Sequence, residues 1–398
     1  MNKLKTIGLS FVLVITILFQ ACTKDNDLST KQTDLKVTVE GPASLQNVVL
    51  NDAVITFTEI NSGNVTTTDE MNDNEVIVTL AEGSYDVALE GEISYELDGE
   101  QLTSQIRGYQ NGLVLSGPTA LLTIETFLHS ETAGFVLQEI FFTGTETPEG
   151  KSYNGDKYFI IYNNSDEVQY ADGLIISESE FLTTTKRVYA PDIMGEAFTA
   201  GSIVMIPGDG DEYPIEPGAS FVVANNAIDH REYNANSLDL RDAEFELELL
   251  SSINVDNPGV TDLINLSGYM TMHNRGYKSY VLAKLEGTPE DFEANNKYTY
   301  QYETEIRTMS RDAYKIPNEW IIDAVNLSVA TEFEWLVTDP SLDMSWTHVG
   351  SIGSDPDRFG KSVRRKVLST TPDGRNILKD TNDSRVDFDA EVQPSLMK

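Results

Sequence analysis

Cysteine is almost absent from this sequence of 398 residues, which contains a single one, Cys22. A lone thiol excludes an intramolecular disulfide framework, so stability has to come from packed cores. Basic side chains are also scarce. Only 28 lysines and arginines stand against 64 aspartates and glutamates, which gives a formal net charge of −36 at pH 7. A surface of this charge repels nucleic acid and anionic lipid head groups, so neither is an expected partner.

Motifs for catalysis and for tight metal binding are missing as well. The four histidines lie in separate segments and form no zinc-binding spacing, and no Gly-x-Ser-x-Gly nucleophile turn occurs. We therefore predict no catalytic residue, no cofactor and no metal site. A pair of catalytic carboxylates is defined by its separation in space, so a hydrolase with an unrecognised carboxylate site stays open as one alternative.

One acidic loop has the residue types that bind calcium. Asp209, Asp211 and Glu212 lie close together in a glycine-containing segment, and oxygen ligands on a flexible loop are what Ca²⁺ prefers. The loop lacks the ligand spacing of the established calcium motifs. We therefore interpret 209–212 as a polar turn between two strands.

The start of the chain has the pattern of an export signal. Lys3 and Lys5 precede a mostly apolar run over 7–19, which is too short to cross about 30 Å of hydrocarbon and so indicates a cleaved signal peptide. Cys22 follows this run and is the expected site of lipid attachment, which makes 1–21 the signal peptide. No later apolar run reaches the roughly 18 residues of a membrane helix.

The residues after Cys22 indicate where the protein is localised. The Lys-acidic segment 23–27 resembles the short signal that directs lipoproteins of some Gram-negative bacteria to the outer face of the outer membrane. We therefore expect a lipid-anchored protein in the outer membrane, exposed at the cell surface. Residues 22–34 are almost free of aliphatic side chains, so we predict that they form a lipidated tether.

From Leu35 onward, apolar and polar residues alternate, which predicts half-buried strands. Asp98 and Gly99 lie between two such runs and are typical of a tight hairpin. The pattern predicts a β-sandwich over 35–128, and a polar break at 129–134 predicts a domain boundary. The segment 82–87, a glycine turn before a strand that starts with tyrosine, resembles transthyretin-like modules of exported proteins.

A second domain is predicted over 134–398. The segment 156–165, with the strand 159–163 and a polar turn, and the strand 170–176 resemble the opening of the lamin-tail domain, an immunoglobulin-like sandwich. Further segments follow in the order of that family: 215–224, 237–240, 361–366 and 380–388. The resemblance implies an all-β protein with an N-terminal transthyretin-like or immunoglobulin-like sandwich followed by a lamin-tail-like sandwich.

Residues 260–345 depart from that family, and we expect them to form a long insertion. Thr288 and Pro289 predict a helix start, since threonine caps helices and proline suits the first helical position. The predicted strands of the insertion are 279–285, 297–303, 319–322 and 331–337.

All three tryptophans fall in or beside this region. Aromatic faces anchor ligands and partner proteins, so we predict that Trp346 and Trp320 contribute to binding. Trp335 alternates with Phe333 in a predicted strand, which favours a core position for Trp335.

The arrangement as a whole, lipoprotein signal included, resembles a lipoprotein family of unassigned function that is often encoded beside TonB-dependent receptors. The resemblance implies a non-enzymatic, surface-exposed accessory of a TonB-dependent receptor that helps to take up a nutrient, with the ligand unknown. An adhesin or envelope-scaffolding lipoprotein is the alternative, followed by the hydrolase.

Overall fold

The computed structural model describes residues 31–42, 45–97, 100–129, 134–247, 255–372 and 374–397. The signal peptide, Cys22 and most of the tether lie outside these residues. Nearly all regular structure is β-sheet, which confirms the predicted all-β sandwich fold. In the part of the chain that is described, no helix is long and apolar enough to span a membrane.

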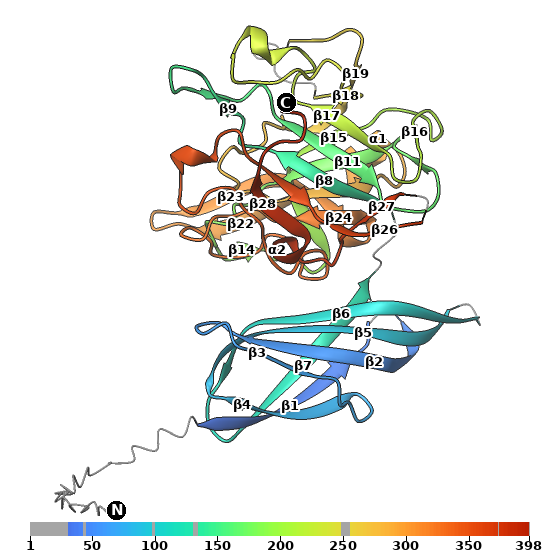
Figure 1. Cartoon of the computed structure of the whole chain (residues 1–398), viewed down its shortest axis with the longest axis vertical. Coiled ribbons are helices and arrows are strands. Elements are labelled where there is room, and N and C mark those ends of the chain that lie inside the picture. The colour runs from blue at the N-terminus through green and yellow to red at the C-terminus, as the bar shows by residue number, and fades with distance from the viewer. Residues whose placement is uncertain are drawn as a thin grey trace, which may run out of the picture.

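The amino-terminal domain has two layers of strands, β3-β2-β5-β6 and β7-β1-β4 (Figure 1). Strand β7 takes part in both, because residues 119–125 pair in parallel with β1 and residues 126–129 pair with β6. The strands are β1 (Gln32–Glu40), β2 (Gln46–Glu59), β3 (Val65–Thr68), β4 (Glu75–Ala81), β5 (Gly83–Leu97), β6 (Glu100–Leu115) and β7 (Thr119–His129).

The alternating pattern explains this core. Leu35, Val37 and Val39 of β1 point inward and are buried, while Lys36 and Thr38 between them are more exposed. The predicted hairpin is present, since Leu97 pairs with Glu100 at the ends of β5 and β6. Its turn residues lie outside the described part of the chain.

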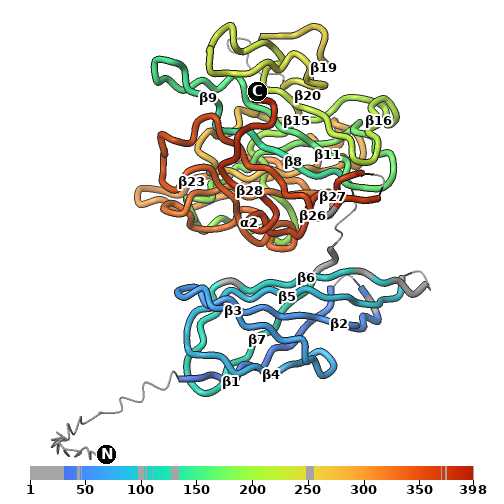
Figure 2. Tube along the Cα trace, viewed as in Figure 1, coloured from blue at the N-terminus to red at the C-terminus, as the bar shows by residue number. Residues whose placement is uncertain are grey.

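The second domain is a larger sandwich. Its first sheet has seven strands in the order β19-β18-β17-β11-β8-β25-β28. These are β8 (Phe135–Phe141), β11 (Tyr158–Asn163), β17 (Ser220–Ala224), β18 (Phe245–Glu246), β19 (Thr261–Asp262), β25 (Ser362–Arg365) and β28 (Phe388–Val392). The last described residues return to this sheet (Figure 2). The side chains of Leu396 and Met397 pack against the core on its outer face.

The second sheet has eight strands, in the order β14-β22-β23-β15-β13-β21-β24 with β20 added beside β15. They are β13 (Leu174–Ser179), β14 (Tyr189–Ala190), β15 (Ala197–Met205), β20 (Ile264–Ser267), β21 (Tyr280–Lys284), β22 (Lys297–Glu303), β23 (Thr308–Pro317) and β24 (Ile321–Val325). Short pairs complete the domain: β9 (Thr145–Glu146) with β10 (Ser152–Tyr153), β12 (Gln169–Tyr170) with β16 (Pro214–Ile215), and β26 (Val367–Thr370) with β27 (Asn376–Leu378).

Residues 260–345, expected as an insertion, are integrated into this sandwich. Strand β21 pairs with β13 on one side and β24 on the other. Its side chains also complete the core between the sheets: the fully buried ring of Tyr280 meets the ring of Phe159 with 5.2 Å between centroids. These residues could not be removed without opening that core.

Local predictions in this region had mixed outcomes. The helix α1 (Pro289–Asn295) is confirmed, with the Thr288 hydroxyl accepting a hydrogen bond from the Asp291 N–H at 3.1 Å. The predicted strand at 331–337 is wrong, because that segment is irregular. Before this region, the predicted strand at 237–240 is reduced to one bridge between Asp229 and Asp239.

Candidate functional site

A pocket of about 660 Å³ opens beside β14, the edge strand of the second sheet. Its two walls are the segments 186–194 and 333–340. Its floor includes Ala197 and Thr199 of β15 and Tyr298 of β22. The pocket therefore joins three parts of the chain that are far apart in the sequence.

Aromatic rings dominate one side of this pocket. Phe181 stacks on Tyr189 with 3.9 Å between centroids, and Tyr189 lies near the indole of Trp335 at 5.8 Å. All three side chains remain partly exposed. Tyr300 and Tyr302 of β22 meet the Tyr189 ring edge to face, each at 5.6 Å. We call Phe181, Tyr189 and Trp335 the aromatic wall.

Hydrogen bonds hold Trp335 in this position. Its indole N–H donates to the carbonyls of Leu182 at 2.9 Å and Thr185 at 3.1 Å. The backbone N–H groups of Glu334 and Trp335 both donate to the carbonyl of Thr183. These bonds direct the backbone of 333–336 to a neighbouring loop, which is why the predicted strand does not form.

The pocket rim carries charges of both signs. Lys186, Arg187, Asp192 and Glu334 are exposed, and the Glu334 carboxylate accepts from the Lys186 N–H at 2.6 Å, which joins the two walls. The Arg187 guanidinium lies over the ring of Tyr302, 5.0 Å from its centroid.

The phenols at the pocket stay neutral at physiological pH. Burial raises the pKa of Tyr189 to about 12, and burial also raises the pKa of Tyr298. The Tyr298 hydroxyl shares a hydrogen bond of 2.6 Å with the Thr199 hydroxyl. The pocket thus offers aromatic faces below a polar rim, an arrangement suited to holding a ligand.

Trp346 and Trp320, the tryptophans predicted to contribute to binding, lie away from the pocket surface. Trp346 stacks on Phe333 at 5.3 Å, so it lies behind a residue of the pocket wall. Trp320 packs near Phe292 of α1 at 6.3 Å and against the core on the outer face of the second sheet. Neither lines the pocket, whereas Trp335, which we expected in the core, does.

The loop of Asp209, Asp211 and Glu212 folds around another carboxylate. The N–H groups of Gly210, Glu212 and Tyr213 donate to Asp172 at 3.1, 2.9 and 2.9 Å. Although burial acts to raise the pKa of Asp172, these hydrogen bonds outweigh it and lower the pKa. The acidic side chains of 209–212 are exposed, which agrees with the interpretation of a polar turn.

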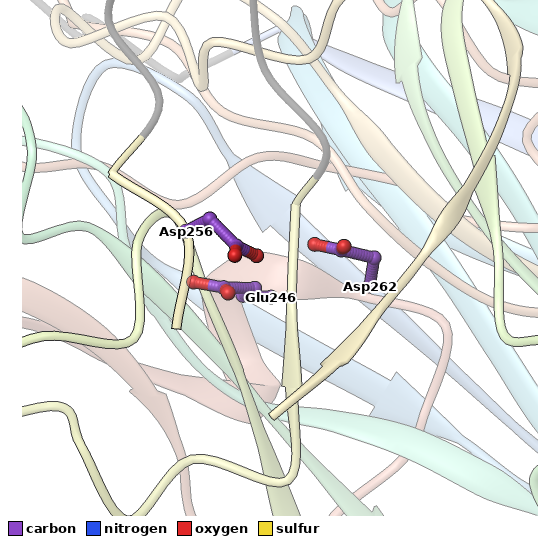
Figure 3. A group of neighbouring side chains, drawn as sticks. All are labelled: Glu246, Asp256 and Asp262. Atoms are coloured by element: carbon purple, nitrogen blue, oxygen red, sulfur yellow. The ribbon is translucent and has the colours of Figure 1, made fainter. Parts of the chain in front are cut away.

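A different carboxylate group could offer oxygens to a cation. Glu246 of β18, Asp256 and Asp262 of β19 bring one oxygen each within 4.8 Å of one another (Figure 3). Buried Glu246 accepts from the N–H groups of Ala227 at 2.7 Å and Asn257 at 2.8 Å. These bonds give Glu246 a structural role without a cation. Sequence spacing could not reveal the group, because its members lie on separate segments.

Comparisons with known proteins extend this picture. Residues 216–395 match the model of a protein family of unknown function, DUF4876. The crystal structure of a DUF4876 family protein from Bacteroides thetaiotaomicron VPI-5482 is similar over 91% of this chain and 96% of that chain, with a TM-score of 0.56 and 22% sequence identity. No curated protein matches the chain. Residues 216–395 are therefore similar to DUF4876, a family of unknown function, and the chain shares its fold with a protein of that family.

Proposed function

We propose that this chain is a non-enzymatic binding protein and that the pocket beside β14 holds its ligand. The observation that carries the proposal is the partly exposed aromatic wall in a pocket of about 660 Å³. This volume lies within the roughly 300–1,000 Å³ of small-molecule sites. Rings that stay open to water add little to folding, whereas a ligand that covers them gains the burial of their faces.

The chemistry of the pocket suggests what such a ligand carries. A flat or apolar group would lie against Tyr189 and Trp335, and polar groups would reach the rim. Lys186 and Arg187 offer donors to an acidic or carbonyl group, while Asp192 and Glu334 offer acceptors to an amine or hydroxyl. An amphipathic nutrient of drug-like size fits both conditions.

In the cell we propose an outer-membrane lipoprotein, anchored through Cys22, that assists a TonB-dependent receptor at the cell surface. This part of the proposal rests on the export signal at 1–27 and on the resemblance to lamin-tail-like lipoproteins encoded beside such receptors. The net charge of −36 argues against a basic membrane-binding patch as the anchor and favours attachment by lipid.

The proposal is tested by capture and growth in parallel. Full-length protein is purified from native membranes in mild detergent, and co-purifying proteins are identified by mass spectrometry. We expect one stoichiometric TonB-dependent receptor, and we expect Trp335→Ala to impair growth on the cognate nutrient without loss of capture. Trp320→Ala is the matched control. Capture of adhesin-like surface proteins in place of a receptor would favour the scaffolding alternative.

A further inference from the structure

A second, smaller pocket of about 300 Å³ lies beside the start of β11, and none of its residues lines the pocket beside β14. Five of its seven lining residues carry an amide, ammonium or imidazole group. We call it the polar pocket; its lining residues are Asn154, Lys157, Asn225, Thr271, Met272, His273 and Asn274.

Asn225 lines this pocket and carries an unused hydrogen-bond acceptor. The residue is 6% exposed, and its Nδ2 donates to the carbonyl of Asn154 at 3.2 Å. That bond fixes the amide orientation, because the flipped amide would face one oxygen with another. The Oδ1 atom of Asn225 has no hydrogen-bond partner among the described residues. A buried acceptor without a donor is unfavourable, so a group that donates to it would be held.

His273 adds a second unused atom. Its Nδ1 is buried and has no partner within the described ranges. The loop that carries it is held in place, since the His273 N–H donates to Glu178 at 2.9 Å. Burial lowers the pKa of His273 to about 4, so the ring is neutral at physiological pH and one ring nitrogen can accept a hydrogen bond.

Lys157 supplies a donor to the same pocket. Its ammonium donates to the carbonyls of Thr271 at 2.9 Å and Met272 at 2.6 Å, although the residue is only 3% exposed. An ammonium has three N–H donors, so these two bonds leave one for a ligand.

We propose that the polar pocket binds a small neutral hydroxylated molecule of monosaccharide size. A carboxylate or phosphate would accept from Lys157 but would bring negative charge against the Asn225 oxygen. A ligand ammonium would donate to Asn225 but would lie against the ammonium of Lys157. A hydroxyl group donates and accepts at the same oxygen, so neighbouring hydroxyls satisfy all three residues. The volume is at the lower limit of ligand pockets, which excludes an oligosaccharide.

The test is calorimetric titration of the full-length chain in a detergent without sugar head groups. The probes are glucose, galactose, mannose and glycerol, with inorganic phosphate and methylammonium as charged comparisons. We expect at least one neutral monosaccharide to bind with a Kd of about 1 mM or tighter, and neither charged probe to compete with it. Tighter binding of phosphate or methylammonium, or binding of no neutral probe, would overturn the proposal.

Two variants place the binding in this pocket. Thr271 is exposed, so Thr271→Trp should leave the melting temperature unchanged while filling the pocket mouth and abolishing binding. His273→Leu removes the Nδ1 atom and should weaken binding about tenfold, roughly the effect of one hydrogen bond. His348→Leu is the matched control, and it should bind as the wild type does. Wild-type affinity in Thr271→Trp would show that the sugar binds elsewhere.

Discussion

The indole of Trp335 lies nearly parallel to the phenol of Tyr189, with 5.8 Å between centroids and 25° between the ring planes. Both rings belong to the aromatic wall, and they come from the two segments, 186–194 and 333–340, that line the pocket beside β14. The hydrogen bonds from the Trp335 indole to Leu182 and Thr185 fix this arrangement before any ligand arrives. Binding therefore need not spend free energy on ordering these rings.

Trp346 supports the pocket from behind, and its removal should reduce stability. We expect Trp346→Ala to lower the free energy of unfolding by about 2 kcal/mol, since a half-buried aromatic ring stacked on Phe333 is lost. Urea unfolding measures this change. Val188→Ala, at a residue 89% exposed on the rim, is the control and should change stability very little. If Trp346→Ala leaves the free energy of unfolding unchanged, Trp346 does not support the pocket, and the original prediction that it contributes to binding is favoured.

Asp343 should make stability depend on pH. Burial raises the pKa of Asp343 to about 7, although its carboxylate accepts hydrogen bonds from Asn326 and Ser384. The pKa of an aspartate in an unfolded chain is about 3.9. Between about pH 4 and pH 7 the folded state therefore binds one proton more than the unfolded state does. The stabilisation from this group is complete below about pH 4 and is lost as the pH rises through about 7.

The measurement is the free energy of unfolding at pH 5 and pH 7.5 for the wild type and Asp343→Asn. The asparagine does not titrate, so we expect the wild type to lose about 2.5 kcal/mol of stability relative to the variant between pH 5 and pH 7.5. Parallel pH profiles for the two proteins would show that Asp343 is ionised throughout.

Arg107 connects the two domains. Its guanidinium, 6% exposed, pairs with Glu90 of its own domain at 2.7 Å and donates to the carbonyl of Thr381 in the second domain. Loss of a charged hydrogen bond typically costs about 1.5 kcal/mol or more, roughly tenfold in an equilibrium. We expect Arg107→Met to speed protease cleavage near 129–134 by about tenfold. Arg311→Met, at an exposed strand position, should leave the cleavage rate unchanged, and equal rates in both variants would remove Arg107 from the domain contact.

Lipid attachment is tested at Cys22. We expect Cys22→Ala to remain unprocessed or to appear in the soluble fraction, because no other residue of this chain offers a thiol for acylation. Fractionation and mass spectrometry of the mature protein measure the outcome. A variant that still carries the same fatty-acid mass in the outer membrane would rule out the lipoprotein assignment.

Much of the fold could be predicted because it follows from local patterns. Alternation identified β1, β4 and β5, and the cap and proline at Thr288 and Pro289 identified the start of α1. Such patterns report which side of a strand is buried, and they need no knowledge of the partner strand. They could not show that 260–345 belongs to the main sandwich, because the pairing of β21 with β13 is a long-range contact.

The candidate site was less accessible to prediction. The clustering of tryptophans indicated the part of the chain that contributes to the pocket. It led us to predict binding by Trp346 and Trp320, whereas the tryptophan that lines the pocket is Trp335. Trp335 alternates with Phe333 like a strand residue. Its position at the pocket depends on long-range hydrogen bonds from its backbone to Thr183 and from its indole to Leu182 and Thr185, which the local pattern does not reveal. Phe181 and Tyr189 are not part of any recognisable sequence motif. They form the aromatic wall only because the fold brings them beside Trp335.

The central claim is that the pocket beside β14 binds the ligand, and a ligand-dependent melting temperature tests it most directly. Full-length protein is screened against amino acids, dipeptides, nucleosides, aromatic acids and sugars, and each hit is repeated with Trp335→Leu and with Trp320→Leu as control. We predict that at least one amphipathic compound raises the melting temperature of the wild type and of Trp320→Leu but not of Trp335→Leu. A compound that stabilises Trp335→Leu as much as the wild type, or a panel without any such hit, would contradict the account.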